Sequence, residues 1–209
     1  NRAILAFAIA FLILLVDQWS KIWIKTHMVI GEEFKVLGSF LRMHFVENEG
    51  MAMGLSWGGE LGKYSLTLFR LVAIAVITFY IYTLIKSKAS KLFIGVMSLI
   101  LAGAMGNVFD SLFYGLVFSD STYEVAQFVP WGTGYKSFMQ GSVVDMISVQ
   151  LFKIPSWFPV YGGQYFFPFI FNIADAAISI GIILVVIFQH RFFLSTEEKE
   201  SEKIAEQAV

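Results

Sequence analysis

The chain has 209 residues, of which 57% are hydrophobic and only 15% are Asp, Glu, Lys or Arg. Soluble domains contain about 25% of these charged residues, so the composition is typical of an integral membrane protein and excludes an ordinary soluble enzyme. The net charge of −1 gives no reason to expect a nucleic-acid partner. Because cysteine is absent and the three histidines are scattered, we expect neither thiol catalysis nor a metal or other cofactor.

Four apolar segments are long enough to cross a bilayer, which takes about 20 residues. They lie at about 3–25, 66–85, 92–113 and 169–190. The predicted fold is therefore an all-α membrane protein, a single four-helix transmembrane domain over residues 1–190. A polar tail follows at 191–209 and is expected to be helical or frayed.

The distribution of lysine and arginine predicts the orientation of these spans. Lys86, Lys88 and Lys91 lie between the second and third spans, Arg2 precedes the first, and Arg191 follows the fourth. All fall on one side of the membrane, and the positive-inside rule makes that side the cytoplasm, with both termini. The long connections at 26–65 and 114–168 then face outward.

The outer connections carry two different patterns. Leu41, Met43 and Phe45 alternate with polar residues, and glycines then break the pattern. This alternation predicts a strand in a small β-sheet, a cradle on the outer face. The second connection is rich in aromatic residues, glycine and proline, and is expected to form an additional loop lobe at the membrane interface.

Five polar clusters interrupt the apolar pattern, all toward the predicted outer side. They are Asp17 with Ser20 and Lys21; Asn48 with Gly50; Asn107 with Asp110 and Ser111; Asp145; and Asn172 with Asp175 and Ser179. Asp175 is expected about six residues, or roughly 9 Å, inside the fourth span. The clusters thus converge near the outer boundary of the hydrocarbon, where an ionisable residue is a functional hypothesis.

Structural roles stay open for single members of these clusters. Asn107 or Ser179 alone would suit a hydrogen bond between neighbouring helices. Asp17 and Lys21 stand at i and i+4, and this self-neutralising pair favours a structural role. The convergence of five clusters at one depth favours chemistry instead.

Paired carboxylates are the chemistry that fits these residues. Ser20 and Lys21 are adjacent and point about 100° apart on a helix, so they form no Ser–Lys pair. Two aspartates held close share a proton, so one can accept a proton from water while the other donates to a carbonyl oxygen. Such a pair hydrolyses amides without metal, thiol or covalent intermediate, but the residues alone do not select which aspartates form it.

The motifs Asp17–Gln18–x–Ser20–Lys21, NEGMAMG, GNVFD, GSVVD and FNIAD occur in this order along the whole chain. In order and topology they resemble the bacterial lipoprotein signal peptidases, or signal peptidase II. The resemblance implies an aspartyl endopeptidase of the bacterial cytoplasmic (inner) membrane, with its active site near the outer face. It would cleave a diacylglyceryl-modified prolipoprotein just before the lipidated cysteine. Its partners would be this substrate and membrane lipid, and a monomer would suffice.

The resemblance also assigns residues by their position in the motifs. It implies that Asp145 and Asp175 are the catalytic pair. The residues that it places around the substrate or the pair are Asp17, Asn48, Gly50, Asn107 and Asn172, with Asp110 in a supporting role. Lys21 and Ser111 are further candidates for support of the substrate or the pair.

Two features depart from the family pattern. Family members usually follow GNxxD with arginine, and here Ser111 stands there, so we consider Arg70 or Lys21 as the replacement cation. The stretch from Ser111 to Gln140 is also longer than the few residues expected between GNxxD and VVD. It is expected to form an extra outer lobe that serves as a flap, in substrate selection or in surface packing.

Two other functions compete with proteolysis. A transporter or proton relay would use Asp17, Asp110 and Asp175 as a carboxylate path, but the inner halves of the spans carry almost no polar groups. A non-catalytic assembly subunit with the same fold is the second alternative.

Overall fold

A computed structural model of the protein describes residues 1–49, 59–166 and 169–207. Its long helices are α1 (Arg2–Lys25), α2 (Gly59–Lys86), α3 (Lys91–Phe109) and α5 (Ile173–Gln207). A π-helical turn at Asp110–Tyr114 and the short α4 (Gly115–Val117) continue α3. Within the described residues, four helical stretches are long and apolar enough to cross a membrane, which confirms the predicted four-span fold.

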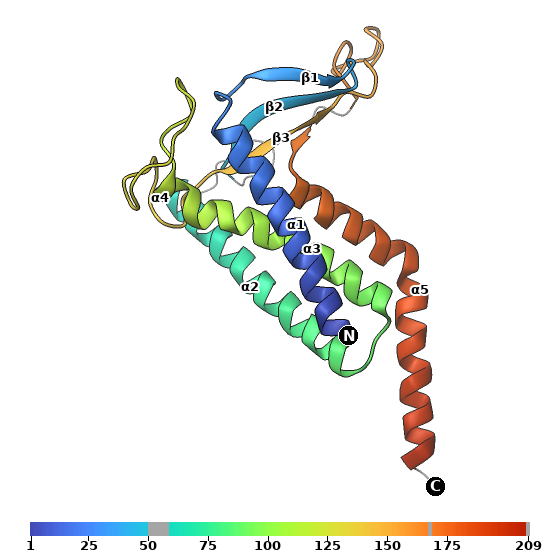
Figure 1. The fold of residues 1–209 in the computed structure, drawn as a ribbon. Coiled ribbons are helices and arrows are strands. Elements are labelled where there is room, and N and C mark those ends of the chain that lie inside the picture. Colours follow the sequence, from blue (N-terminus) through green and yellow to red (C-terminus); the bar gives the residue numbers. More distant parts are fainter. Residues whose placement is uncertain (50–58, 167–168, 208–209) are drawn as a thin grey trace.

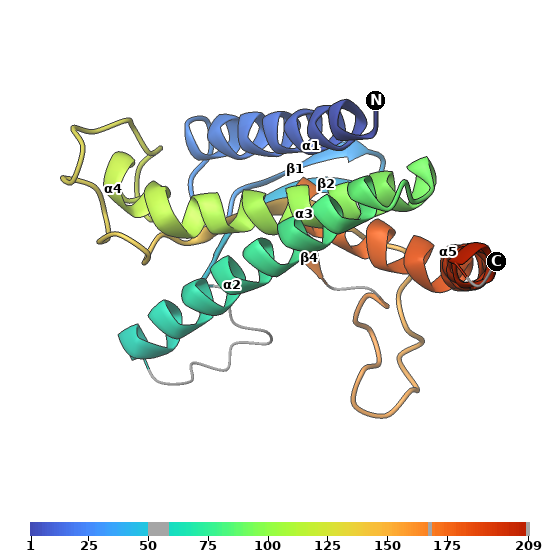
Figure 2. The ribbon, with the colours of Figure 1, turned by 90° about the horizontal axis from the view of Figure 1, so that it is seen from below.

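The helices surround α3, and a sheet lies across one end of them. α1, α2 and α5 all pack against α3 (Figure 2). The sheet lies at the end where α1 and α3 finish and α5 begins, while the C-terminal part of α5 extends away from the bundle (Figure 1). Three helix ends that carry polar residues therefore meet beneath the sheet.

Small residues on α3 allow its neighbours to approach closely. A Cβ atom on Gly103 would lie 2.3 Å from the carbonyl oxygen of Ala174 in α5. A Cβ on Gly106 would lie 2.5 Å from the Oδ2 atom of Asp17 in α1. Close backbone approach of this kind is typical of helix packing in membranes. Here it brings the polar ends of α1 and α5 within bonding distance of α3.

The sheet has four antiparallel strands in the order β1-β2-β3-β4. They are β1 (Glu33–Leu37), β2 (Leu41–Asn48), β3 (Val143–Val149) and β4 (Ile170–Phe171). The predicted strand around Leu41 to Phe45 is confirmed as part of β2. Asn48 pairs with Val143, two residues from Asp145, so Asn48 and Asp145 lie on the same face of the sheet.

The opposite face of the sheet holds it to the helix ends. Phe45, Val144 and Met146 are fully buried there and pack with Ile24 of α1 and Tyr114 of the π-helical turn. Burying these large side chains stabilises the sheet in a fixed position relative to α1 and α3. The polar face carrying Asp145 is thereby held at the bundle end.

The start of the fourth span corrects one prediction. Residues 170–171 pair with β3 as β4, so α5 begins at Ile173 and not near 169. Asp175 consequently lies in the first turn of α5 and not six residues inside the span. The helix also continues through most of the polar tail, to Gln207.

The close contact at Gly103 makes a stability prediction. Gly103→Ala should lower the free energy of unfolding by about 1–3 kcal/mol, because the new methyl group meets rigid backbone of α5. Gly95→Ala is the matched control on the same helix, since its Cβ meets only the side-chain tip of Ile9, at 3.3 Å. Thermal unfolding in detergent checks both variants. Equal stability of the two would contradict this account of the α3–α5 contact.

Candidate active site

The motif FNIAD forms the N-terminal cap of α5. The Asp175 backbone N–H donates to Oδ1 of Asn172 at 2.9 Å, and the Asn172 backbone N–H donates to Oδ2 of Asp175 at 3.2 Å. This reciprocal pair is a capping box, in which the residues at the cap and three positions later satisfy each other's backbone donors. The cap fixes the orientation of the Asp175 carboxylate at the positive end of the helix dipole.

Asn172 also binds the second candidate catalytic aspartate. Its side-chain Nδ2 donates to Oδ1 of Asp145 at 2.7 Å, and Nδ2 of Asn48 donates to Oδ2 of Asp145 at 3.1 Å. Asn172 is fully buried and Asp145 is 3% exposed. One asparagine therefore bonds both carboxylates, with its side chain to Asp145 and its backbone to Asp175.

A second asparagine, Asn107 of α3, completes this arrangement. Its Nδ2 donates to Oδ1 of Asp175 at 2.8 Å, and its Oδ1 accepts from Nδ2 of Asn172 at 3.1 Å. The amide orientations are mutually fixed, because each Nδ2 must face an oxygen and each Oδ1 a donor. Asn107 is thus an interhelical hydrogen-bonding residue and also a direct neighbour of the candidate pair.

Burial and a neighbouring charge together raise the pKa of Asp145. The pKa of Asp145 is raised to about 7, mainly by burial and also by the nearby charge of Asp175, although the hydrogen bonds from Asn48 and Asn172 act in the opposite direction. Two neighbouring carboxyl groups in a site of low dielectric hold a proton that exposed aspartates would lose near pH 4. The site can therefore present one carboxylic acid and one carboxylate near neutral pH.

A buried charge network lies next to this pair. Nζ of Lys21 is 2.9 Å from Asp17, 2.8 Å from Asp110 and 3.0 Å from Oδ1 of Asn107. Asp17, Lys21 and Asp110 are all fully buried. The predicted Asp17–Lys21 pair is therefore only part of a larger network, which α1 shares with α3.

Two carboxylate oxygens of this network also accept hydrogen bonds from backbone next to the candidate catalytic aspartates. Oδ1 of Asp17 accepts from the Ala174 N–H of α5 at 2.8 Å, and Oδ2 of Asp110 accepts from the Val144 N–H of β3 at 3.3 Å. Ala174 and Val144 immediately precede the two candidate catalytic aspartates. The network thus positions Asp175 and Asp145 through their neighbouring backbone.

Gln18 is a site residue that sequence reasoning used only as part of a motif. Its Nε2 donates to Asp110 at 2.8 Å, and its Oε1 accepts from the Tyr114 hydroxyl at 3.2 Å. A glutamine inside an apolar helix needs partners, and this signal was available in the sequence. It links α1 to the π-helical turn, a structure often found at functional sites.

The comparisons with known proteins place this geometry in a family. A model of "Signal peptidase (SPase) II" matches residues 9–191. The chain is 43% identical to a lipoprotein signal peptidase of Porphyromonas gingivalis over 86% of this chain and 80% of that protein. It is 32% identical to one of Staphylococcus aureus, over 92% and 91% of the two chains.

The chain belongs to the signal peptidase II family. It is therefore a peptide hydrolase. The fold agrees, since two solved bacterial membrane enzymes at 29% and 30% identity superpose with TM-scores of 0.57 and 0.56. They cover 89% and 87% of this chain, and the chain covers 87% and 90% of theirs.

Three serines of the predicted polar clusters have no hydrogen bond to an aspartate side chain within the described part of this signal peptidase II chain. Ser111, at the usual arginine position, donates to the Asn107 carbonyl of its own helix at 3.1 Å. Ser20 likewise bonds the Asp17 carbonyl within α1, at 2.7 Å. Ser179 is exposed, and Gly50 lies outside the described residues.

Lys21 is the cation that holds carboxylates in this signal peptidase II chain. Its contacts with Asp17 and Asp110 show that a positive charge is present without the usual arginine. Arg70 of α2 is half-buried and interacts electrostatically with Asp175, Asp110 and Asp145. Among the described residues it forms no ion pair, so its part in the site is long-range.

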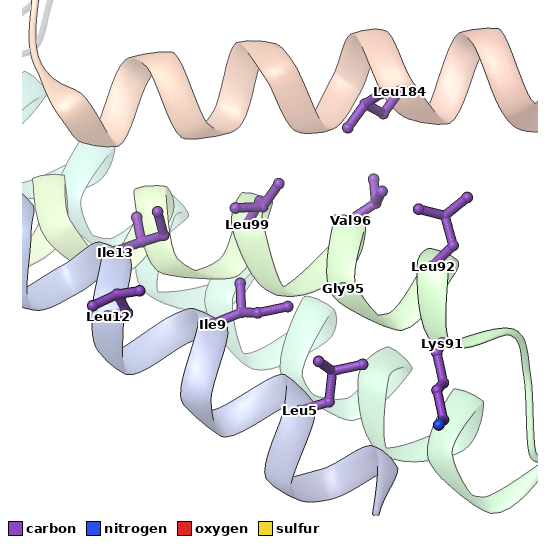
Figure 3. A pocket seen from close by; sticks show the side chains of 10 residues that line it. All are labelled: Leu5, Ile9, Leu12, Ile13, Lys91, Leu92, Gly95, Val96, Leu99 and Leu184. Carbon is purple, nitrogen blue, oxygen red and sulfur yellow. The ribbon is translucent and has the colours of Figure 1, made fainter.

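An apolar groove lies on the other half of the bundle, away from the aspartates. It has a volume of about 610 Å³ between α1, α3 and α5 (Figure 3). Leu5, Ile9, Leu99 and Leu184 are among the side chains that line it, and Lys91 lies at its end. Apart from Lys91 the lining of this groove is apolar, so the groove is chemically distinct from the aspartate cluster.

The buried network predicts the effect of removing its cation. Lys21→Met should destabilise the protein by about 3–5 kcal/mol, because Asp17 and Asp110 would remain buried without a counter-charge. Adding Asp17→Asn and Asp110→Asn should recover much of that loss. Lys86→Met is the control, since that ammonium lies over the Tyr82 ring, 4.6 Å from its centroid. Thermal unfolding of the variants checks this order, and a Lys21→Met protein as stable as the control would contradict it.

Proposed function

We propose that this chain cleaves the signal peptide from diacylglyceryl-modified lipoprotein precursors, just before the lipidated cysteine. The substrate class rests on the relatives of Porphyromonas gingivalis and Staphylococcus aureus, which are lipoprotein signal peptidases. The catalytic groups are Asp145 and Asp175. The observation that carries this assignment is that Asn172 hydrogen-bonds both carboxylates.

The reaction follows from the chemistry of the pair. A water molecule bound between the two carboxyl groups loses a proton to the ionised aspartate as its oxygen attacks the scissile carbonyl carbon. The protonated aspartate donates to the carbonyl oxygen, which gives a neutral tetrahedral intermediate. Proton transfer to the amide nitrogen then breaks the C–N bond and releases the amine of the cysteine. Protons leave and return to the pair, so no covalent enzyme intermediate is needed.

Three asparagine side chains are fixed hydrogen-bond donors to the carboxyl groups, so few polar groups need to move during the reaction. Asn48, Asn107 and Asn172 hold the carboxyl oxygens in place, and each is itself bonded or packed in the site. Preorganised dipoles of this kind stabilise charge that develops in a transition state without moving. Asp17, Lys21 and Asp110 act behind them as positioning residues.

The orientation of the protein follows from its basic end. Nε of Arg2 donates to the Ala89 carbonyl at 2.9 Å, so the start of α1 lies beside the connection that carries Lys86, Lys88 and Lys91. The positive-inside rule makes this end cytoplasmic. The sheet and the aspartates then lie near the outer face of the bacterial cytoplasmic membrane, where the signal helix of a substrate would end.

The arrangement of polar groups argues against a proton relay. A relay path must reach both membrane faces, yet the half of α1 from Ala3 to Val16 has no polar residue. The groove between that half and α3 and α5 is lined almost entirely by apolar side chains. The polar network is confined to the sheet end, as a hydrolytic site requires.

Substitution of either aspartate tests the catalytic assignment. Asp145→Asn and Asp175→Asn should each lower cleavage at least ~1000-fold, because neither variant has a carboxyl pair to share a proton. Asp120→Asn, an exposed aspartate in residues 118–140, is the control and should retain cleavage. The measurement is release of the leader peptide from a diacylglyceryl-modified precursor by purified protein. Full activity of either dyad variant would refute the assignment.

The raised pKa of Asp145 predicts the pH dependence of cleavage. The pair needs one shared proton, and this proton is lost as pH rises through about 7. The value of kcat/KM should therefore fall on the alkaline side with a midpoint near that pH. Initial rates between about pH 5 and pH 9 measure it, and a profile that stays flat on the alkaline side would contradict a shared-proton mechanism.

A further inference from the structure

The long segment between GNVFD and GSVVD forms a folded lobe over residues 118–140. Ser119 N–H donates to the Gln127 carbonyl at 3.0 Å, and Tyr135 N–H donates to the Phe118 carbonyl at 3.0 Å. Lys136 N–H donates to the carbonyl of Gly115 at 3.0 Å, which ties the lobe to α4. These bonds make the lobe a defined body beside the helix ends (Figure 1).

We propose that the lobe is a positioning element. It keeps Asn48 hydrogen-bonded to Asp145 by binding the two glutamates on either side of Asn48. This inference rests on the proposed function for its effect on cleavage. It assigns a role to Lys136, which lies outside the family motifs, and to Glu49, a residue of NEGMAMG to which the resemblance gives no role.

The first contact between the lobe and these glutamates is at Glu47, within β2. Oε1 of Glu47 accepts from Oγ of Ser121 in the lobe at 3.2 Å and forms an ion pair with Lys25 of α1. Lys25 is fully buried, and its Nζ also contacts Ser121 Oγ at 2.8 Å and lies 4.6 Å from the centroid of the Tyr135 ring. The lobe, α1 and β2 thus share one buried ammonium group.

The second contact is at Glu49, which directly follows β2. Its Oε1 atom forms an ion pair with Lys136 of the lobe and lies 3.8 Å from Nζ of Lys63 in α2. The hydrogen bond from Lys136 lowers the pKa of Glu49, so this carboxylate stays charged at neutral pH. Glu49 is 55% exposed, so the pair adds little to global stability and acts mainly on local position.

Strand geometry explains how these two glutamate contacts affect the candidate catalytic pair. Successive side chains along an extended chain point to opposite sides, so Glu47 and Glu49 point toward the lobe while Asn48 points away from it. Asn48 there donates to Oδ2 of Asp145 at 3.1 Å. Fixing both glutamates fixes the backbone of Asn48 between them, and with it this hydrogen bond.

The lobe also holds the strand that carries Asp145. The hydroxyl of Tyr135 accepts from the Ser142 N–H at 2.8 Å, three residues before Asp145. Both partners of the Asn48–Asp145 bond are therefore positioned from the same lobe. Because the Asn48 bond favours the charged form of Asp145, loosening it should raise the pKa of Asp145 further.

The variants Lys136→Gln and Glu49→Gln test this proposal separately. Each should lower kcat/KM roughly tenfold and move the alkaline limb of the pH profile to higher pH, because misplaced Asn48 no longer favours ionised Asp145. Each should also speed hydrogen exchange in the peptide covering β2, with little change in the unfolding temperature. Lys136→Arg should restore both readouts. Lys153→Gln is the matched control, since its ammonium lies over the Tyr165 ring, 5.4 Å from the centroid, and outside the lobe.

Hydrogen exchange separates this proposal from the proposed function. If the unmodified protein cleaves no lipidated precursor, the proposed function fails, but exchange in β2 still reports whether the lobe holds the strand. The positioning role is overturned if Lys136→Gln and Glu49→Gln match the Lys153→Gln control in both pH profile and exchange. It is also overturned if either variant loses activity only in proportion to a lowered unfolding temperature.

Discussion

In the apolar part of a bilayer a charged side chain finds no water, so the charges at the end of this bundle must satisfy one another. Lys21 does this for α1 and α3 by bonding Asp17, Asp110 and Asn107. Oδ1 of Asp17 accepts from the backbone of α5, and Oδ2 of Asp110, which Lys21 also contacts, accepts from the backbone of β3. This buried triad therefore positions the backbone next to Asp175 and Asp145.

Side-chain amide groups link the triad to the carboxyl pair through hydrogen bonds. Asn107 and Asn172 bond each other and each bonds a candidate catalytic aspartate. Removing one partner of such a network leaves buried groups unsatisfied, which costs far more than the bond itself contributes. The same rigidity that satisfies these groups keeps two carboxyl groups close enough for Asp175 to raise the pKa of Asp145.

The sequence predicted the features that depend on local pattern. The four spans follow from apolar length and β2 from alternation, and the gathering of Asp17, Asn107 and Asp175 follows from their place toward one end of the spans. Its motifs resembled the family that the comparisons then showed. The capping box in FNIAD was not predicted, although its signal, a cap residue with an acid three positions later, is present in the sequence.

Features that depend on contacts between distant segments were not predictable. β4 forms because residues 170–171 pair with β3. This pairing delays the start of α5, so Asp175 lies in the first turn of the helix. Lys21 appeared to be satisfied by Asp17 alone, because Asp110 lies on another helix. The lobe contacts of Glu47 and Glu49 likewise join residues more than 70 positions apart, for which periodicity gives no signal.

The central claim is that buried Asp145 and partly buried Asp175 hold one proton near neutral pH. Infrared difference spectroscopy of the purified protein between about pH 5 and pH 9 measures this directly through the C=O stretch of protonated carboxylic acids. The account predicts a carboxylic acid band that disappears around pH 7 and is absent from Asp145→Asn. A band that titrates identically in Asp145→Asn, or no band titrating near neutral pH, would contradict it.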